Sequence, residues 1–332
     1  MRPLVRLWLS RLAMMLASWL LVIGLTWLPA GVFWVEEGDL PVGVVWGVRT
    51  ESMQPFILEP EPVARKPRAH WSVSQYGQAV VTYVRELVTG QVTDYSHRWT
   101  ESGPVQIPEP VLPQVRERMV VSLRLLSRAL VLGMAAGFAL GVLSLRRGAA
   151  RGFSLGISVA GMALPEFVVV LLLQMLTIFT YREFGIRLYS VLGPSGGERG
   201  WLVPLLALSL GPMAYTARLV AGGLDEVMRE DFIRTARAKG LSEARVVMKH
   251  GLRHVLGRVL GGFPTIMGNA LSSMVIIEVL ANVNGLAGGL MANWSSRMVA
   301  TTGLVFCLWF GLLDALANTL RILANPRLRE GA

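Results

Sequence analysis

The sequence predicts an all-α, polytopic membrane protein with six transmembrane helices and an extracellular segment between the first and the second helix. Of its 332 residues, 53% are hydrophobic and only 16% are charged. A soluble domain carries about 25% charged residues, so this composition requires lipid or an unusually large dry core. Six stretches are long and apolar enough for a spanning helix of about 20 residues. Basic residues gather between them, as in the cytoplasmic loops of membrane proteins.

The six apolar stretches cover residues 12–33, 119–145, 153–181, 201–221, 259–283 and 301–323. The first is longer than the apolar region of a signal peptide, about 7–15 residues, and we expect it to be retained. Arg124 and Arg128 lie in the first two turns of the second stretch, where they either extend to the lipid head groups or face a polar pathway; we favour the head groups. Gly133, Gly137 and Gly141 repeat every four residues in the same stretch, which predicts a face buried against another helix.

The distribution of Lys and Arg predicts the orientation of the chain. One side holds most of the basic residues, at the N-terminus, after the second stretch, in segment 222–258 and in the tail: Arg2, Arg6, Arg11, Arg146, Arg147, Arg151, Arg229, Arg234, Arg237, Lys239, Arg245, Lys249, Arg253, Arg258, Arg321, Arg327 and Arg329. The opposite short loops hold few: Arg182, Arg187, Arg199 and Arg297. Because the positive side is cytoplasmic, both termini are predicted to be cytoplasmic and the long segment after the first helix to be extracellular.

The chain therefore divides into four parts: an N-terminus with the first helix (1–33), an extracellular segment (34–118), a five-helix core (119–323) that includes the cytoplasmic segment 222–258, and a cytoplasmic tail (324–332). The extracellular part contains nine of the 17 prolines, which disfavour regular structure. One portion is nevertheless periodic, with Ser72 or Ser74 as a possible N-cap and Gly90 as a stop. Its apolar residues fall on one helical face: Tyr76, Ala79, Val80, Tyr83, Val84, Leu87 and Val88. We expect an amphipathic helix lying on the membrane or on other helices; a separate soluble domain is disfavoured, because the rest of the segment lacks a core pattern.

Three acidic residues inside the apolar stretches are candidates for a permeation pathway or a subunit interface: Glu166, Glu278 and Asp314. A carboxylate is costly in lipid and usually faces a cavity or a partner. Glu278 and Asp314 lie deep in the fifth and sixth stretches and are the stronger candidates. Glu166 follows Pro165 and either lines the pathway or reaches the membrane interface.

The most informative segment, 231–254, lies between the fourth and fifth stretches. Its pattern predicts two short helices, because Gly240 can adopt the left-handed conformation that ends a helix and Ser242 is placed as an N-cap. The second helix would carry a modest apolar face, formed by Val246, Val247 and Leu252. A solvated basic loop is the simpler alternative. Such a loop rarely needs apolar residues at a helix–glycine–helix turn, so we expect a soluble partner to dock here.

Within this segment, Thr235-Ala236-Arg237-Ala238-Lys239-Gly240-Leu241-Ser242, followed by His250-Gly251-Leu252-Arg253, resembles the EAA loop of ABC importer permeases of the dipeptide, oligopeptide and nickel class. Arg234 occupies the place of the family's first glutamate. Ile277-Glu278-Val279, leading to Asn284-Gly285-Leu286-Ala287-Gly288, is similar to the family's V-E-x-x-F-x-x-P-G-L-G. The ending Asn325-Pro326-Arg327-Leu328-Arg329 is similar to its D-P-R-I-R. The resemblance extends from about Tyr76 to Arg329.

The chain departs from the family's pattern at several positions. Asn284 stands in place of a proline and Asn325 in place of an aspartate. The aspartate and tyrosine usual in the last helix are Asn318 and Arg321, while Asp314 falls where asparagine is usual. The family's P-G-D-P after the first helix is absent, and Leu28-Pro29-Ala30-Gly31 is the nearest match to it. These departures bear on the substrate and the level of activity, rather than on the class.

The resemblance implies the type I permease fold, with 231–254 as the coupling helix that fits a groove on an ATPase subunit. It also implies two such ATPase subunits, a second homologous permease and an extracellular solute-binding protein. The substrate would be a dipeptide, an oligopeptide, nickel or another small solute. The chain itself is not expected to be an enzyme, because a nucleotide-binding P-loop needs G-x-x-x-x-G-K-[ST], and the three lysines are followed by Pro67, Gly240 and His250. No cofactor is implied.

Other classes of function have weaker support. A self-contained secondary transporter could use Glu278 and Asp314 as ion sites, but the sequence shows no convincing internal repeat. An intramembrane enzyme lacks a catalytic motif, and the basic residues are distributed as in membrane loops rather than in a nucleic-acid-binding patch. Cys307 is the single cysteine, and with four scattered histidines it builds no obvious metal site.

Overall fold

A computed structural model describes residues 2–35, 41–42, 68–100, 103–146, 148–186, 188, 198–292 and 295–324. These form two compact units: Trp19–Leu112, and Met1–Ser18 together with Pro113–Ala332. Helix α1 (Arg2–Trp27) contributes to both units. The predicted family ending at 325–329 lies outside the described residues, as do Arg147 and Arg187.

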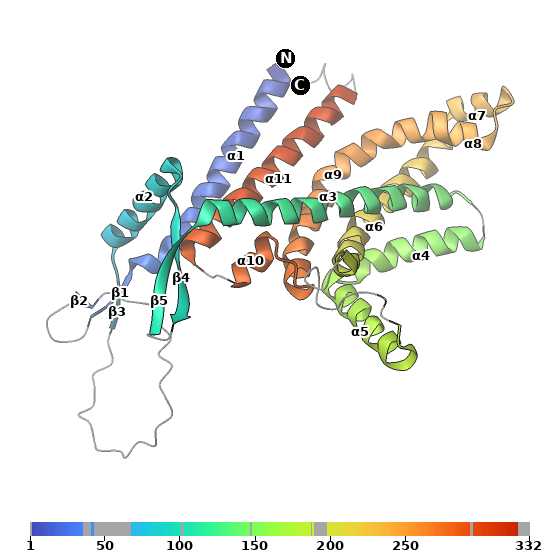
Figure 1. Ribbon diagram of the computed structural model, residues 1–332. Helices are drawn as coiled ribbons and strands as arrows, with labels where there is room; N and C mark the ends of the chain where they lie inside the picture. Colours follow the sequence, from blue (N-terminus) through green and yellow to red (C-terminus); the bar gives the residue numbers. More distant parts are fainter. Residues whose placement is uncertain are drawn as a thin grey trace. The chain divides into compact units, whose positions relative to one another are not determined.

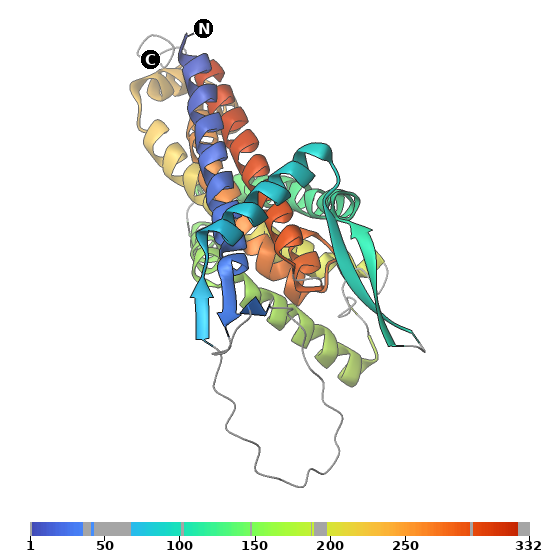
Figure 2. The same ribbon diagram turned by 90° about the vertical axis from the view of Figure 1, so that its left-hand side faces the viewer.

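The larger unit is built from helices (Figure 1). After the first part of α1 they are α3 (Val111–Leu143), α4 (Ala149–Ala163), α5 (Glu166–Phe184), η3 (Glu198–Trp201), α6 (Leu202–Val227), α7 (Asp231–Ala238), α8 (Glu243–Arg245), the π-helical turn η4 (Val246–Gly251), α9 (Leu252–Leu280), α10 (Leu286–Ala292) and α11 (Ser296–Ala324). The N-terminal part of α1 lies beside α11 in both ribbon views (Figures 1 and 2). The two helices run antiparallel there: the Trp8 indole donates to the Thr319 hydroxyl at 3.2 Å, and Arg11 pairs with Asp314 at 2.8 Å.

Six helices of the described chain are long and apolar enough to cross a membrane: Trp8–Gly31, Val111–Leu143, Glu166–Phe184, Leu202–Val227, Glu243–Leu280 and Ser296–Thr319. The predicted class and number of spans are confirmed, and the chain is a multi-pass membrane protein. The predicted boundaries are less accurate. The second and fifth spans both begin earlier than the apolar stretches that indicate them, because their first turns are amphipathic.

The third apolar stretch is not one helix. It breaks between α4 and α5, where Leu164 is extended (φ −83°, ψ 121°) and Pro165 precedes the first residue of α5. Proline lacks the N–H that would continue the ladder and excludes the preceding residue from the helical region. The 15-residue α4 falls short of the length of a full span, so α5 supplies the spanning segment of this stretch.

The glycine repeat of α3 faces α6, which confirms the predicted buried face. A Cβ at Gly133 would overlap the carbonyl oxygen of Ser209, and one at Gly137 would lie 2.5 Å from that of Met213. One at Gly141 would lie 2.5 Å from the Cβ of Val220. Close approach of the two backbones therefore requires glycine at all three positions. The contacts advance in the same direction along both helices, so α3 and α6 run parallel, as alternate spans must.

In the smaller unit, α2 (Val73–Thr89) is the predicted amphipathic helix. The Ser72 hydroxyl accepts from the backbone of Gln75 at 3.4 Å, and Gly90 ends the helix with φ 72°. Tyr83 is fully buried, with its ring centroid 5.5 Å from that of Trp27 on α1. The rest of the predicted face is half-buried, except for Val88. Its assignment was wrong: it is 79% exposed in the last turn of α2.

The same unit contains strands that the sequence reasoning did not predict. β1 (Val32–Val35) pairs antiparallel with β2 (Pro41–Val42) and β3 (Arg68–Trp71), and β4 (Thr93–Thr100) forms a hairpin with β5 (Gly103–Pro110), visible in Figure 2. The prolines of β5 lie opposite Thr93, Tyr95 and Trp99, at alternating register positions. Their missing N–H groups therefore fall on the outer edge of the hairpin, where no ladder bond is lost. Proline content alone argued against strands, whereas the spacing of the prolines permits them.

Candidate functional site

The predicted docking segment forms a sharp turn between α7 and α8. Gly240 has φ 77°, which confirms the predicted left-handed end of α7. The backbone N–H groups of Gly240 and Leu241 donate to the carbonyls of Arg237 (2.9 Å) and Ala236 (3.4 Å), so the last carbonyls of the helix are satisfied. Ser242 occupies the N-cap position of α8, but its side chain makes no capping hydrogen bond.

An ion pair joins the two sides of this turn. Arg237 donates from Nε to Oε1 of Glu243 at 2.7 Å and from Nη2 to Oε2 at 3.2 Å. This two-bond geometry is more specific than that of an ordinary surface ion pair. The pair restricts the angle between α7 and α8, and the sequence reasoning had not paired these two residues.

The apolar residues of the segment are used inside the chain. Ile233 and Val246 are fully buried and Ala236 is 6% exposed, and the three form one cluster against which Leu241 packs. We had expected Val246 and Val247 to present an apolar face to a partner, and this was wrong. Both valines are buried within the chain instead: Val246 packs against Ile233 and Ala236 of α7, and Val247 packs against α6.

The second helix of the segment is not a separate short helix, as predicted. α8 continues through η4 into α9, so that Glu243–Leu280 forms one span. Val247 and Leu252 pack against α6 in a cluster with Val220 and Leu224. Packing beside them is tight, since a Cβ at Gly251 would lie 3.0 Å from the Leu224 side chain. A π-helical turn within a long helix often marks a functional position.

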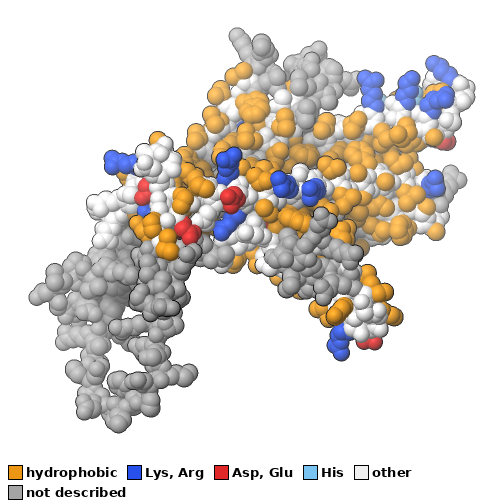
Figure 3. All heavy atoms as spheres, viewed as in Figure 1, with side chains coloured by type: hydrophobic (Ala, Val, Ile, Leu, Met, Phe, Trp, Pro, Cys, Tyr) orange, Lys and Arg blue, Asp and Glu red, His pale blue; other side chains and the backbone are white. Residues whose placement is uncertain are grey.

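The exposed surface of the turn is basic with an aromatic edge. Lys and Arg side chains gather over α7, α8 and the start of α9 (Figure 3). Of the predicted coupling residues, the exposed ones are Thr235, Arg237, Ala238, Lys239, Gly240, Ser242 and Arg253, while His250, Leu241 and Leu252 are half-buried. Phe232, 40% exposed, stacks at 5.0 Å on His254, and Met248 is 65% exposed. The surface thus offers positive charge and a few apolar side chains to a partner.

Glu278 lies at the centre of a buried hydrogen-bond network. Its side chain is completely buried, and its Oε1 accepts from the Ser122 hydroxyl of α3 at 2.5 Å. Its Oε2 accepts from the backbone N–H groups of Ala287 (2.8 Å) and Gly288 (3.4 Å) in the first turn of α10. Ser122 in turn accepts from the backbone of Leu286 at 2.8 Å. One carboxylate therefore joins α3, α9 and α10.

Two glycines of the family motif leave room for the Glu278 carboxylate and for the turn around it. A Cβ at Gly285 would overlap the Glu278 carboxylate, and one at Gly288 would overlap the carbonyl oxygen of Val283. The chain turns before them at Asn282, which has φ 50°. Asn284, in place of the family's proline, is exposed at this turn. The motif is therefore a tight loop folded around a buried acid.

Asp314 is also buried, at 5% exposure, but its partner is a charge. Its Oδ2 lies 2.8 Å from Nε of Arg11, as an ion pair whose geometry is not that of an aligned hydrogen bond. Its Oδ1 accepts from the Asn318 amide at 3.0 Å. The family's usual order of asparagine and aspartate is exchanged at these two positions, and they remain hydrogen-bonded to each other. From the sequence alone, Arg11 was only one of the basic residues of the N-terminus and was not predicted to be the partner of Asp314.

Glu166 is half-buried at the start of α5, opposite Gly211 of α6 and Asn269 of α9. A Cβ at Gly211 would lie 3.5 Å from Oε1 of Glu166 and 3.7 Å from Nδ2 of Asn269. The glycine therefore leaves a gap between two polar side chains. A cavity of about 380 Å³ follows one to two turns along the same helices, lined by Met162, Tyr215, Arg218, Leu219, Arg258, Gly262 and Thr265.

Three features of these candidate sites were not predicted from the sequence: the contacts of Ser122, the position of Asn269 and the pairing of Arg237 with Glu243. A polar residue in an apolar helix is a weak signal, because serine and asparagine are tolerated at many helix contacts. Ser122 and Asn269 differ from other polar residues of the spans only in the groups that they contact in the folded chain. Within the described ranges, no group of three or more His, Cys, Asp or Glu residues is placed to hold a metal ion.

The chain is similar to known membrane proteins of transport systems. Residues 129–330 match the family model described as "Binding-protein-dependent transport system inner membrane component". The chain is 30% identical over 226 residues to the dipeptide transport system permease protein DppB of Lactococcus lactis subsp. cremoris, covering 67% of this chain and 73% of that protein. It is 30% identical over 231 residues to the glutathione transport system permease protein GsiC of Escherichia coli K12, covering 66% and 72%.

Among solved structures, one of the inward-facing MetNI methionine ABC transporter is similar, with a TM-score of 0.49 and 15% identity over 65% of this chain and 96% of that one. The family match spans the helices α6 to α11 and both motifs described above, the turn at Gly240 and the loop around Glu278. The chain therefore belongs to the family of inner-membrane components of binding-protein-dependent transport systems.

Proposed function

We propose that this chain is the transmembrane permease subunit of an ATP-driven ABC importer, which forms a path for peptides together with a second permease. The observation that supports this most directly is the turn α7–Gly240–α8. It is held internally by an ion pair and an apolar cluster, and it presents a basic outer surface. The family membership and the relatives named for dipeptide and glutathione transport support the same function.

The length of the fifth span supports a location of this turn outside the membrane. Glu243–Leu280 has 38 residues. At about 1.5 Å per residue it is roughly 57 Å long, well beyond the ~30 Å hydrocarbon core of a bilayer. We place the excess at the N-terminal end, where the basic residues lie, so that α7 and α8 project into the cytoplasm and can meet a soluble subunit.

The continuity of α8 with α9 suggests how a docked ATPase would be coupled to the spans. A displacement of the docked turn moves α8, and α8 is continuous with α9 through η4. Val247 and Val255 pack α9 against Val220 and Leu224 of α6, so the movement reaches a second span as well. Closure of an ATPase pair would then change the arrangement of the two permeases, as an interface-driven two-state transition.

The partners in this proposal are two ABC ATPase subunits, a second homologous permease and an extracellular solute-binding protein. ATP would be hydrolysed by the ATPase subunits, since no P-loop motif occurs in the sequence. The location would be the cytoplasmic membrane of a bacterium or archaeon, with both termini in the cytoplasm. The substrate proposed is a peptide, as the relatives' names favour.

We place the permeation path beside Glu166. Its carboxylate faces the gap at Gly211 and the Asn269 amide, and the neighbouring cavity continues along α6 and α9 towards Arg218 and the ion pair of Arg258 with Glu226. A half-exposed acid inside a span is expected to face water or a partner rather than lipid. For Glu278 and Asp314 we propose positions next to the path rather than in it, because their carboxylates are engaged within the chain. A secondary transporter relying on these two acids has no support from the family match.

The coupling proposal is tested by two glycines that both have a positive φ. Gly240 (φ 77°) and Gly148 (φ 75°) both have open space around a hypothetical Cβ. Valine at either position costs more than about 1 kcal/mol, because β-branched residues avoid this conformation. Gly240→Val should abolish co-purification of the ATPase subunits and ATP-coupled uptake, with normal membrane insertion. Gly148→Val, in the loop before α4, should retain both.

Two outcomes would contradict the coupling proposal. If Gly240→Val inserts normally and keeps full ATP-coupled uptake, the turn is not the coupling element. If both valine variants lose uptake equally, the loss reflects strain in general. In either case the functional assignment would rest on family membership alone.

The orientation is tested by single cysteines in a Cys307→Ser background. A cysteine at Gln106, in β5, should react with a membrane-impermeant thiol reagent in whole cells. A cysteine at Ala149, at the start of α4, should react only after the membrane is opened. The reverse pattern would place the basic turn outside the cell and remove it from contact with an ATPase.

A further inference from the structure

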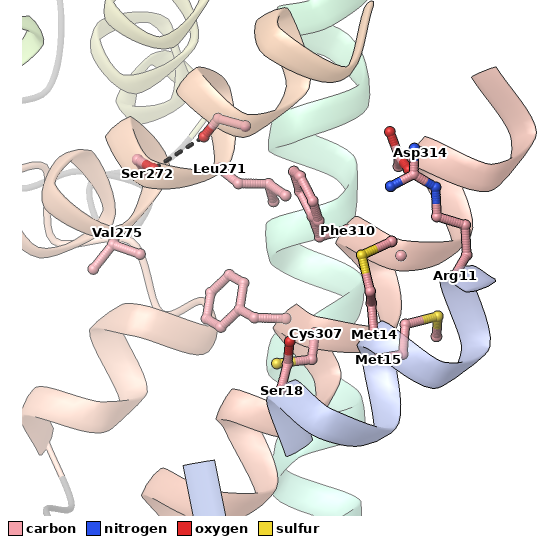
Figure 4. A pocket seen from close by; sticks show the side chains of 13 residues that line it. Arg11, Met14, Met15, Ser18, Leu271, Ser272, Val275, Cys307, Phe310 and Asp314 are labelled. Carbon is pink, nitrogen blue, oxygen red and sulfur yellow. Dashed lines mark hydrogen bonds and ion pairs between the residues drawn. The ribbon is translucent and has the colours of Figure 1, made fainter. Parts of the chain in front are cut away.

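A cavity of about 520 Å³ lies between α1, α9 and α11, away from the proposed path (Figure 4). In the close view, Leu271, Ser272 and Val275 of α9 face residues of α1 and α11 across it, and Arg11 and Asp314 point toward each other at one end. The lining is Arg11, Met14, Met15, Ser18, Gly268, Leu271, Ser272, Val275, Phe306, Cys307, Phe310, Gly311 and Asp314. A volume of this size with an apolar lining and few polar groups is typical of a ligand site.

The cavity lies at the depth of lipid acyl chains. Every lining residue belongs to a candidate span, namely Trp8–Gly31, Glu243–Leu280 or Ser296–Thr319. From Arg11 to Ser18 the helix advances by roughly 10 Å towards the middle of the membrane. Arg11 itself lies one turn from Trp8, at the edge of its span. The polar end of the cavity is therefore at a membrane face, and its apolar part extends into the hydrocarbon region.

The cavity opens sideways rather than into the core of the helix bundle. Met14 is 48% exposed, Phe310 42% and Val275 38%, whereas Leu271 at the back is 7% exposed. In a membrane, the solvent that bathes such an opening is lipid. Water would leave the apolar lining unfavourably hydrated, and an acyl chain restores the apolar contacts. The methionine side chains adapt to an occupant of irregular shape.

The ion pair at one end suits a phospholipid head group. The ion pair of Arg11 with Asp314 is formed through Nε, and the Arg11 side chain is 29% exposed. A guanidinium has five N–H donors in a planar arrangement, so others remain for a phosphate oxygen. The Asp314 carboxylate beside it keeps the local charge near zero, which favours a zwitterionic head group over a strongly anionic one.

We propose that this cavity is a lipid site, which holds one acyl chain of a membrane phospholipid with its head group at Arg11. The bound chain would fill the space between α1 and the α9–α11 pair, so that α1 is attached to the core partly through lipid. This inference depends only on the location of the chain in a membrane. It stands or falls independently of the transport proposal.

The test uses the full-length chain, reconstituted in vesicles of phosphatidylethanolamine and phosphatidylglycerol that contain a phosphatidylethanolamine with a diazirine on its acyl chain. After irradiation, lipid adducts are mapped by peptide mass spectrometry. We expect adducts in residues 11–18, 268–275 and 306–314, in addition to those on the exposed face of α5. Ser272→Phe places a ring in the cavity and should lower the adducts in these three segments by about tenfold or more.

Two controls make the result specific. Ser272→Ala removes the hydroxyl, which donates to the Gly268 carbonyl, without filling the space, and should keep the adducts. Adducts on α5, where Met175 is 66% exposed, should stay unchanged in both variants and show that the chain is inserted normally. The proposal would be overturned if the three segments carried no adducts, or if the Ser272→Phe variant were labelled there as strongly as the wild-type protein. A photoactivatable thiol reagent on Cys307 that crosslinks to another protein chain, in membranes of the cells that produce this one, would do so as well, by showing a protein helix in the cavity.

Discussion

Glu278 and Asp314 are both acids buried within membrane-spanning helices, yet they are stabilised in opposite ways. Glu278 accepts hydrogen bonds only from neutral donors, the Ser122 hydroxyl and backbone N–H groups of α10. Asp314 faces a cation, Arg11, which belongs to the first helix of the chain. The first arrangement fixes the path of a loop, and the second joins the two ends of the helix bundle.

The difference has a consequence for the response to mutation. A carboxylate surrounded by backbone donors is part of the local fold, and its loss leaves several buried donors without acceptors. A carboxylate opposite an arginine can be neutralised together with its partner at little cost. Glu278 is therefore expected to be hard to replace by any residue. Asp314 should be replaceable when Arg11 changes with it.

The largest effect is expected for Glu278→Leu. The change leaves the Ser122 hydroxyl and the N–H groups of Ala287 and Gly288 unpaired, at about 1–3 kcal/mol for each buried group. The complex should lose most of its yield, and its midpoint of thermal unfolding in detergent should fall by several degrees. Transport or pairing with the second permease should be impaired. Glu278→Gln keeps one acceptor oxygen and should lose less. A leucine variant with normal assembly and transport would show that the network is dispensable.

A second test adds volume instead of removing an acceptor. Gly285→Ala forces a Cβ against the Glu278 carboxylate and should destabilise the protein by about 1–3 kcal/mol, as overpacking does. Gly257→Ala on α9 is the matched control, because no atom lies within 4 Å of its Cβ position and alanine favours a helix. Equal unfolding midpoints for the two variants would mean that the loop adapts and that Glu278 does not fix it.

The ion pair is tested by a double-mutant cycle. Arg11→Gln and Asp314→Asn should each destabilise the protein by about 1–2 kcal/mol, less than for a fully buried pair because Arg11 is partly exposed. The double variant should be more stable than the sum of the single effects predicts. Unfolding midpoints of all four proteins give the coupling free energy. Additive losses would indicate that the two residues act separately and that the comparison with Glu278 fails.

The smallest effect is expected for Ser122→Ala. The hydroxyl both donates to Glu278 and accepts from the backbone of Leu286, so its loss should cost about 0.5–1.5 kcal/mol. Ser127→Ala on the same helix is the control, because its exposed hydroxyl returns only to the carbonyl of Arg124. If both serine variants unfold at the wild-type midpoint, Ser122 contributes nothing to the network that distinguishes Glu278 from Asp314.

Local signals in the sequence were sufficient for much of the fold. The six spans follow from apolar length, α2 follows from its period with Ser72 and Gly90 at its ends, and the turn at Gly240 follows from one glycine between two helical patterns. In each case the structure is determined by interactions between residues that are close in the sequence. The Gly133–Gly137–Gly141 repeat is the limiting case: it predicted a buried face, but not that α6 would cover it.

Contacts between distant residues could not be predicted in this way. The break at Pro165 had a local cause, yet the apolar residues on both sides of Pro165 and Glu166 concealed it. The hairpin β4–β5 was missed because proline content was weighed without its register. The valines of the coupling segment were assigned to a partner, whereas the chain buries them against α7 and α6.

By itself, the sequence determined that this is a six-span membrane protein with a basic turn at Gly240 and with acids in three of its spans. Apolar length, charge distribution and the left-handed preference of glycine are properties of short segments, so a single chain suffices to show them. Only the tertiary structure decided what each acid does. Hydrogen bonds and ion pairs depend on groups brought together from distant positions, 303 apart for Arg11 and Asp314, and the free energy of a buried charge is set by those groups rather than by its own helix.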